Sequence, residues 1–271
     1  MSRKVALAVG CHPDDVEFGM AGTLSLLAKA GFEPHIHTMT TGSLGSMVLP
    51  EEEIAAIRGK EAAKSASLIN ATYHHGIVDD LMVYYENALV RKTTALVRQV
   101  KPTIVLLPSL EDYMEDHMNT ARIVVTACFA RAMTNYYSYP PVEPFGDDIY
   151  LYHAQPHLNR DMMCRPILPN LVVDIESEMK LKEKMLAAHE SQKEWLDVTQ
   201  GQDSYLETMW ELGKDVVKVA GVQGIEYGEG WRQHSWVGYS AKPKDVLSEV
   251  LGRKAKRVLK RPYGRTAASR P

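Results

Sequence analysis

The 271-residue sequence predicts an α/β fold, with a Rossmann-like, mostly parallel sheet that carries helices on both faces in a three-layer sandwich. Short, continuous apolar runs indicate strands that are buried on both faces. Segments with apolar residues at helical spacing separate these runs. Alternating strands and helices of this kind build a parallel sheet through right-handed crossovers.

The first half of the chain has the clearest pattern. Residues 5–11 form an apolar run that ends at a proline-containing acidic turn, as expected of a buried first strand. In residues 18–29 apolar side chains recur at helical spacing, and Gly31 provides a left-handed stop. Acidic residues after Pro50 suit the first turn of another helix, because negative charge is favoured at a helix N-terminus. This half continues with strands at 34–40, 71–77 and 103–108 and helices at 50–68 and 87–100.

The second half has a looser pattern, in which an acidic loop over 111–116 precedes a helix. Its further elements are strands at 148–154 and 171–175 and helices at 176–195 and 204–222. No linker rich in Pro, Gly or Ser interrupts the chain, so we expect one domain over residues 1–251, with its C-terminal part packed over the site. Residues 252–271 carry eight Lys and Arg and no acid, which favours a solvated or disordered tail over a nucleic-acid or membrane contact.

Composition narrows the class of protein. The net charge of −3, from 31 basic and 34 acidic residues, gives no overall attraction to nucleic acid or anionic membranes. No run of about 18 apolar residues occurs, so we expect no membrane span. Three cysteines without zinc-ribbon spacing favour a reduced, cytoplasmic protein without disulfides. The composition is compatible with a homo-oligomer as well as with a monomer.

Polar side chains follow two of the predicted strands. His12, Asp14 and Asp15 come after the first strand, and Asp116 and His117 come after a later one. Because ligands bind outside the carboxyl ends of strands in open parallel sheets, we expect these groups to meet. His12, Asp15 and His117 are the imidazole and carboxylate donors that zinc takes in catalytic sites, where one position stays open for water. Asp14, pointing elsewhere across the tight turn, is then a general base. Alone, His12 or Asp14 would be typical of a helix cap or a turn, but the second Asp-His pair favours the metal site.

The same residues resemble a known family. The segments HPDDVE at 12–17 and GMAGT at 19–23 resemble the HPDDxE and GxxGT signature of the LmbE-like or PIG-L family, which are zinc-dependent deacetylases of N-acetylglucosamine-containing molecules. Residues 58–63 resemble the family's RxxEAxxA helix, and residues 116–117 resemble its DH pair. Residues 171–175 resemble a later strand of the family, 189–192 its HxSQ segment and 225–231 its closing element. The resemblance spans residues 4–240.

The resemblance implies roles for individual side chains. It implies that His12, Asp15 and His117 bind zinc and that Asp14 activates a water. It also implies that Asp116 orients its neighbour or the water of the site.

Arg58 has two interpretations of equal weight. The resemblance implies that it contacts the sugar or a phosphate-like group of the substrate. The alternative is an i,i+3 salt bridge to Glu61, since such pairs are common on helices.

The sequence departs from the family at Met114, where many members have the first histidine of an HPDH motif. The resemblance implies that this histidine stabilises the tetrahedral intermediate or assists proton transfer, and methionine does neither. His189 and His234 are the candidates to replace it, although each is more typical of a packed or surface histidine. Tyr113 is a candidate hydroxyl donor to the oxyanion.

Two further features favour ordinary structural roles. Cys11 is adjacent to His12, but a cysteine that ends a buried strand is more often part of the core than a nucleophile. The small-residue loop at 42–47 resembles a phosphate loop only weakly, since it lacks the third glycine and does not follow the first strand.

The sequence therefore predicts a metal-dependent hydrolase that removes an acetyl group from an N-acetylated sugar or glycoconjugate, with metal-bound water as the nucleophile and Asp14 as the base. Zn²⁺ is the first choice of metal, and Fe²⁺ or Ni²⁺ would suit the same donors. One alternative is a relative that binds a glycan or a metal without turnover. Another is an amidase for a thiol conjugate, which would need an apolar groove where a sugar needs polar groups and Arg58.

Overall fold

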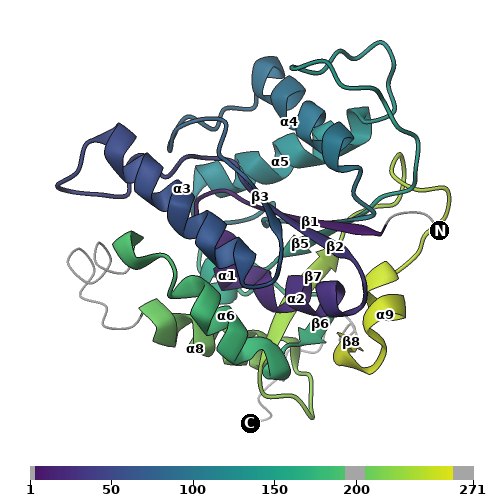
Figure 1. Cartoon of the computed structure of the whole chain (residues 1–271). Helices are drawn as coiled ribbons and strands as arrows, with labels where there is room; N and C mark the ends of the chain where they lie inside the picture. Colours follow the sequence, from purple (N-terminus) through teal and green to yellow (C-terminus); the bar gives the residue numbers. More distant parts are fainter. Residues whose placement is uncertain (1–3, 193–204, 259–271) are drawn as a thin grey trace, which may run out of the picture.

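The computed structural model describes residues 4–192 and 205–258 (Figure 1). One sheet of eight strands runs through the molecule in the order β3-β2-β1-β4-β5-β7-β6-β8. The parallel half of the sheet contains β1 (Val5–Gly10), β2 (Glu33–Thr38), β3 (Thr72–His74), β4 (Ile104–Leu107) and β5 (Tyr150–Ala154). The other half pairs antiparallel and contains β6 (Leu171–Asp174), β7 (Gly228–Gln233) and β8 (Ala255–Arg257).

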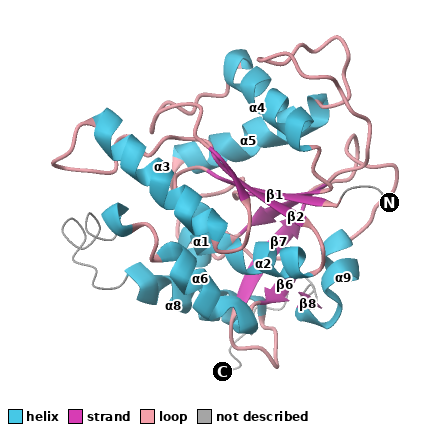
Figure 2. Cartoon of the chain, viewed as in Figure 1, coloured by secondary structure: helices cyan, strands magenta, loops and turns pink. Residues whose placement is uncertain are grey.

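Helices cover both faces of the sheet, as Figures 1 and 2 show. On one face lie α4 (Asn87–Val100) and α5 (Glu115–Ala130). The other face carries α1 (Asp15–Gly19), α2 (Ala21–Lys29), α6 (Met179–Leu186), α9 (Val246–Leu251) and the beginning of α8 (Tyr205–Ala220). Later residues of α8, Val216 and Val217, pack separately against Val172 of β6. The end of α3 (Glu51–Ser67) packs there too, and short 3-10 helices are η1 (His157–Asn159), η2 (Glu176–Glu178) and η3 (Gly252–Lys254). The predicted α/β fold with a mostly parallel sheet is confirmed.

The alternation of side chains along β1 explains the two layers. Every residue of β1 is buried. Val5, Leu7 and Val9 pack in the core under α4 and α5, whereas Ala6 and Ala8 pack in the core on the opposite face. Successive residues of a strand point to opposite faces, so a continuous apolar run is what a strand between two helical layers requires.

Three predicted elements differ in the structure. The helix expected at 18–29 is divided at Met20, whose φ of −139° and ψ of −20° are not helical. The helix expected at 176–195 consists of η2 and α6 and is interrupted at residues 187–189, and its end at 193–195 lies outside the described residues. The basic segment expected as a tail from residue 252 starts inside the sheet, because β8 pairs with β6. Residues 259–271 lie outside the described part of the chain.

Two absences bear on the class of protein. Within the described ranges, no helix is both long and apolar enough to cross a bilayer. The three cysteines of the chain are free in the structure.

Candidate metal centre and its cavity

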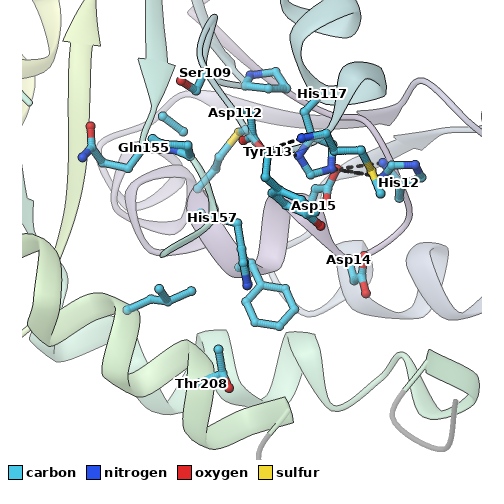
Figure 3. A pocket seen from close by; sticks show the side chains of 18 of the residues that line it. His12, Asp14, Asp15, Ser109, Asp112, Tyr113, His117, Gln155, His157 and Thr208 are labelled. Atoms are coloured by element: carbon cyan, nitrogen blue, oxygen red, sulfur yellow. Dashed lines mark hydrogen bonds and ion pairs between the residues drawn. The ribbon is translucent and has the colours of Figure 1, made fainter. Parts of the chain in front are cut away.

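The neighbouring strands β1, β4 and β5 end at one edge of the sheet, and the segments that follow them form the wall of a cavity. Its volume is about 520 Å³. His12, Asp14 and Asp15 come from the end of β1, and Asp112, Tyr113, Met114 and His117 come from the segment after β4. Figure 3 shows the side chains of His12, Asp14, Asp15, Asp112, Tyr113 and His117 gathered in one place. This is the edge at which open α/β sheets bind ligands.

Three donor atoms form a compact triangle at the cavity. His12 Nδ1 lies 3.2 Å from His117 Nε2 and 3.6 Å from Asp15 Oδ2. His117 Nε2 lies 3.4 Å from the same carboxylate oxygen. Donors about 2.0–2.1 Å from a tetrahedral Zn²⁺ are about 3.3–3.4 Å from one another, so the triangle fits such an ion. The three sequence-predicted ligands are thus brought together with spacing suited to one metal.

The outer nitrogens of both histidines face carboxylates. His12 Nε2 lies 3.4 Å from Asp116 Oδ2, and His117 Nδ1 lies 3.2 Å from Asp112 Oδ1. Metal-binding histidines ordinarily have such a partner, because it holds the proton on the outer nitrogen and leaves the inner lone pair for the metal. The structure therefore places Asp116 against His12 rather than against its sequence neighbour.

The charges of the cluster favour a cation between the two rings. Burial would lower the pKa of His117, but Asp15 and Asp112 raise it overall. Burial would also lower the pKa of His12, yet the carboxylates of Asp116 and Asp15 hold it well above its usual range. Burial would raise the pKa of Asp15, and His117 and His12 lower it instead. Carboxylates that stay ionised around two facing imidazoles are suited to a positive ion.

A tight turn after β1 positions the two aspartates differently. The Oδ2 atom of Asp15 accepts the backbone N–H groups of Cys11 and His12, both at 2.8 Å, which fixes this carboxylate toward the histidines. Asp14 has φ 116° and ψ −20°, a conformation that is strained for a residue with a side chain. The left-handed conformation of Asp14 turns the two consecutive carboxylates apart. Asp14 therefore lies beside the ligand cluster, which consists of His12, Asp15 and His117, rather than within it (Figure 3).

Asp14 is buried between two polar partners. The hydroxyl of Tyr205 donates to Asp14 Oδ2 at 2.6 Å, and Arg58 Nη2 lies 3.6 Å from Asp14 Oδ1. Burial raises the pKa of Asp14, the Arg58 guanidinium lowers it in part, and Asp15 raises it further. Tyr205 lies 191 residues from Asp14 in the sequence, so no local sequence signal connects the two residues.

Arg58 does not form the helical salt bridge offered as its alternative role. Glu61 instead accepts the backbone N–H and the hydroxyl of Ser191. Arg58 is buried, lines the cavity and donates to the carbonyl oxygen of Pro13 at 2.6 Å. Among the described residues its ion-pair partner is Asp14.

A second group of donors, made of Cys11, His12 and Asp116, shares the histidine ring. Neither Cys11 nor Asp116 lines the cavity, so a metal held there would not face a substrate. The Cys11 thiol is fully buried, and burial raises its pKa to about 11. This cysteine therefore stays a core thiol at neutral pH rather than a nucleophile.

The two histidines considered as replacements for the motif histidine lie outside the cavity lining. His189 is fully buried, with Nε2 3.3 Å from Glu17 Oε1. His234 hydrogen-bonds to His153 at 2.9 Å on the far side of β5. Tyr113 does line the cavity and packs its ring edge-on at 5.6 Å from His117, with its hydroxyl pKa raised to about 12 chiefly by burial.

The structure instead brings His157 into the cavity (Figure 3). His157 lies three residues beyond the end of β5, on η1. His157 could have been predicted by the same signal as His12, because it follows the carboxyl end of a predicted strand. The wall opposite the ligand cluster comes from α8 and β7 and includes Thr208, Leu212 and Val216.

The backbone N–H groups of the loop at 42–47 already bind a carboxylate of the protein itself. The backbone N–H groups of Gly42 and Leu44 donate to the two carboxylate oxygens of Asp80, each at 3.0 Å. These donors are the groups with which a phosphate loop holds its ligand. Since Asp80 occupies them, the loop contributes Leu44 and Gly45 to the cavity wall and offers no phosphate site.

Fold and site together define an α/β protein with a metal-type donor triangle at the carboxyl edge of its sheet. Residues 7–128 match the PIG-L family model, described as GlcNAc-PI de-N-acetylase. The chain is 24% identical to diacetylchitobiose deacetylase of Thermococcus kodakarensis over 241 residues, which cover 84% of this chain and 82% of that protein. Residues 7–128 thus match a PIG-L (LmbE-like) domain, and the chain is homologous to diacetylchitobiose deacetylase.

Solved structures agree on the fold. The N,N'-diacetylchitobiose deacetylase of Pyrococcus horikoshii superposes with a TM-score of 0.71 at 26% identity, covering 91% of this chain and 89% of that one. GalB of Pseudomonas putida, a 4-carboxy-2-hydroxymuconate hydratase, also gives a TM-score of 0.71, at 21% identity, covering 89% and 98%. The same fold therefore serves more than one reaction, and a function must be argued from the site.

Proposed function

We propose that this protein is a metal-dependent hydrolase that removes the acetyl group from an N-acetylated sugar. The observation that carries the proposal is the triangle of His12 Nδ1, His117 Nε2 and Asp15 Oδ2 with a separate buried carboxylate, Asp14, beside it at the same cavity. The deacetylase names of the homologues in Thermococcus and Pyrococcus support the same reaction.

The metal would be held by His12, Asp15 and His117, with Zn²⁺ as the first choice because two imidazoles and a carboxylate are common zinc donors. When bound, such an ion supplies a water of lowered pKa and polarises the acyl oxygen. Fe²⁺ and Ni²⁺ suit the same donors, so the metal has to be identified by measurement.

Asp14 would move the proton in this reaction. As a carboxylate it accepts a proton from the attacking water, and as the acid it returns that proton to the nitrogen that leaves. The raised pKa of Asp14, caused by burial, makes it a stronger base than an exposed carboxylate. Arg58 and Tyr205 would hold the carboxylate in place, through the 3.6 Å ion pair and the 2.6 Å hydrogen bond.

Tyr113 would donate its hydroxyl hydrogen to the acyl oxygen as negative charge develops there. Its pKa of about 12 keeps the hydroxyl protonated at neutral pH. A donor aimed at a developing oxyanion is a common means of stabilising this transition state.

The cavity supports a sugar better than a thiol conjugate. Its volume of about 520 Å³ lies within the usual range for small-molecule sites. The cavity wall includes the polar side chains of Arg58, Asp80, Gln155 and Asn159, which are groups suited to sugar hydroxyls. A wholly apolar groove, expected for the conjugate, is not what these residues form.

The test is amine release from N-acetylglucosamine and diacetylchitobiose by purified protein, as prepared, after chelation, and after adding back Zn²⁺, Fe²⁺ or Ni²⁺. Loss of activity on chelation and its return with one metal are the expected results. If the protein holds one tightly bound metal per chain but releases no amine from either sugar, the alternative of a binding protein without turnover is favoured.

A further inference from the structure

His157 presents a free imidazole to the middle of the cavity. In Figure 3 its ring lies between the ligand cluster and Thr208 of α8. Phe18 packs edge-on to it at 6.1 Å between ring centroids, and the Tyr113 ring lies 5.7 Å away on the other side. These two rings hold the imidazole plane without using its nitrogens.

The nitrogens of His157 differ from those of the other cavity histidines. Both nitrogens of His12 and of His117 face a carboxylate or each other at 3.2–3.6 Å. Over residues 4–192 and 205–258, no hydrogen bond or ion pair to the ring of His157 is formed. Among the imidazoles that line the cavity, it is therefore the one whose polar atoms are left for a ligand.

The protonation state of His157 defines what it would bind. Burial lowers its pKa, and the nearby Asp112 opposes that effect only in part. A neutral imidazole has one N–H donor and one lone-pair acceptor. A hydroxyl group both donates and accepts, so it can pair with either nitrogen, whereas a carboxylate only accepts and an ammonium group only donates.

The backbone of the segment is fixed to the opposite wall. The buried side chain of Asn159 donates to Asp215 Oδ2 at 3.1 Å and to the carbonyl oxygen of Leu212 at 3.4 Å, both on α8. Leu158 and Asn159 both have left-handed conformations, with φ of 59° and 55°. This sharp turn directs the preceding residue, His157, back into the cavity.

We propose that His157 hydrogen-bonds a hydroxyl of the substrate sugar next to the acetamido group and so selects N-acetylated sugars over other amides. This role rests on the proposed deacetylase function and adds to it a residue that recognises the substrate. The position fits, because the Tyr113 ring is shared between His117 of the ligand cluster and His157, at 5.6 Å and 5.7 Å. A hydroxyl on the carbon beside the reacting amide would lie on that side of the cluster.

The experiment pairs a change in the protein with a change in the substrate. His157→Phe keeps an aromatic ring between Phe18 and Tyr113 but removes both nitrogens, and His157→Gln keeps a donor and an acceptor. Values of kcat/KM are measured for N-acetylglucosamine and for its 3-deoxy analogue. We expect His157→Phe to lower kcat/KM about 10–100-fold on N-acetylglucosamine and less than about threefold on the 3-deoxy analogue, because the partner hydroxyl is then missing. His157→Gln should recover most of the loss.

Equal loss on both substrates, or no loss on either, would overturn the inference. His75→Phe, at an exposed position outside this cavity, is the matched control and should leave both values unchanged. Metal content and melting temperature of each variant show that the cluster and the fold are intact.

A failure of the proposed function gives a different result. If the wild-type protein releases no amine, the same proteins are compared by calorimetric dissociation constants for N-acetylglucosamine and its 3-deoxy analogue. A His157-dependent preference for the hydroxyl would then uphold the recognition role without catalysis, and no such preference would remove it.

Discussion

The carboxylates behind the proposed metal ligands should control metal affinity. Asp112 lies 3.2 Å from His117 Nδ1 and Asp116 lies 3.4 Å from His12 Nε2, so each fixes a different ring. We expect Asp112→Asn and Asp116→Asn each to weaken Zn²⁺ binding about 10–100-fold, or about 1.4–2.7 kcal/mol, because the inner nitrogen becomes less basic and less well oriented. Since both rings would hold the same ion and lie 3.2 Å apart, the two effects are coupled, and the double variant should bind Zn²⁺ more weakly than either single variant.

The assay is competition for Zn²⁺ against a chromophoric chelator at pH 7.5. Asp174→Asn is the matched control, since this carboxylate on β6 accepts the backbone N–H of Glu176 and does not line the cavity. Unchanged Zn²⁺ affinity in both single variants would refute the reasoning. So would an equal loss in the control.

Three further predictions concern stability and chemistry. Glu229→Gln should lower the free energy of unfolding by about 3–5 kcal/mol, because it leaves the buried ammonium of Lys182, now 2.5 Å from Glu229, without a counter-charge. Adding Lys182→Met should recover part of that loss in urea unfolding, and a further loss would contradict the ion-pair account. Burial lowers the pKa values of His37 and His153 to about 4, below the unfolded value of about 6.5. The unfolded chain therefore binds more protons than the folded chain as the pH falls from 6.5 to 4. The free energy of unfolding should drop by up to about 3 kcal/mol for each ring over this range. A urea midpoint that does not change between pH 6.5 and pH 4 would contradict this prediction. Asp14→Asn should keep one metal per chain but lose about 10²–10⁴-fold in kcat, and near wild-type turnover would exclude this residue as the base.

The part of the fold that the sequence predicted best is the part with local signals. β1 and β4 are continuous apolar runs, and the sequence segments between the strands have apolar residues at helical spacing. The same signals located His12, Asp15 and His117, because these residues follow the ends of strands that are adjacent in the sheet. The donor triangle could thus be predicted from topology.

The antiparallel half of the sheet could not be predicted in this way. β7 has the sequence GEGWRQ, with two glycines and little apolar character. Side chains at these glycines would collide with packed neighbours, since an added Cβ at Gly228 would lie 2.5 Å from Val172 Cγ1 and one at Gly230 would lie 2.6 Å from Val216 Cγ2. The strand is therefore defined by tertiary packing against β6 and α8 rather than by propensity.

Contacts between site residues that are far apart in the chain could not be predicted from the sequence either. Tyr205 meets Asp14 only because α8 folds back over the end of β1. His157 enters the cavity through a turn with two left-handed residues, for which Leu158 gives no local signal. Arg58 was weighed against a local salt bridge, and the structure pairs it instead with a residue on another element.

The central claim is tested most directly by titrating Zn²⁺ into metal-free protein while amine release from diacetylchitobiose is recorded. The account predicts that activity rises linearly and reaches its plateau at one Zn²⁺ per chain, and that His117→Ala stays inactive throughout. Full activity in the chelated protein, or in His117→Ala, would contradict the assignment of the reaction to the cluster of His12, Asp15 and His117.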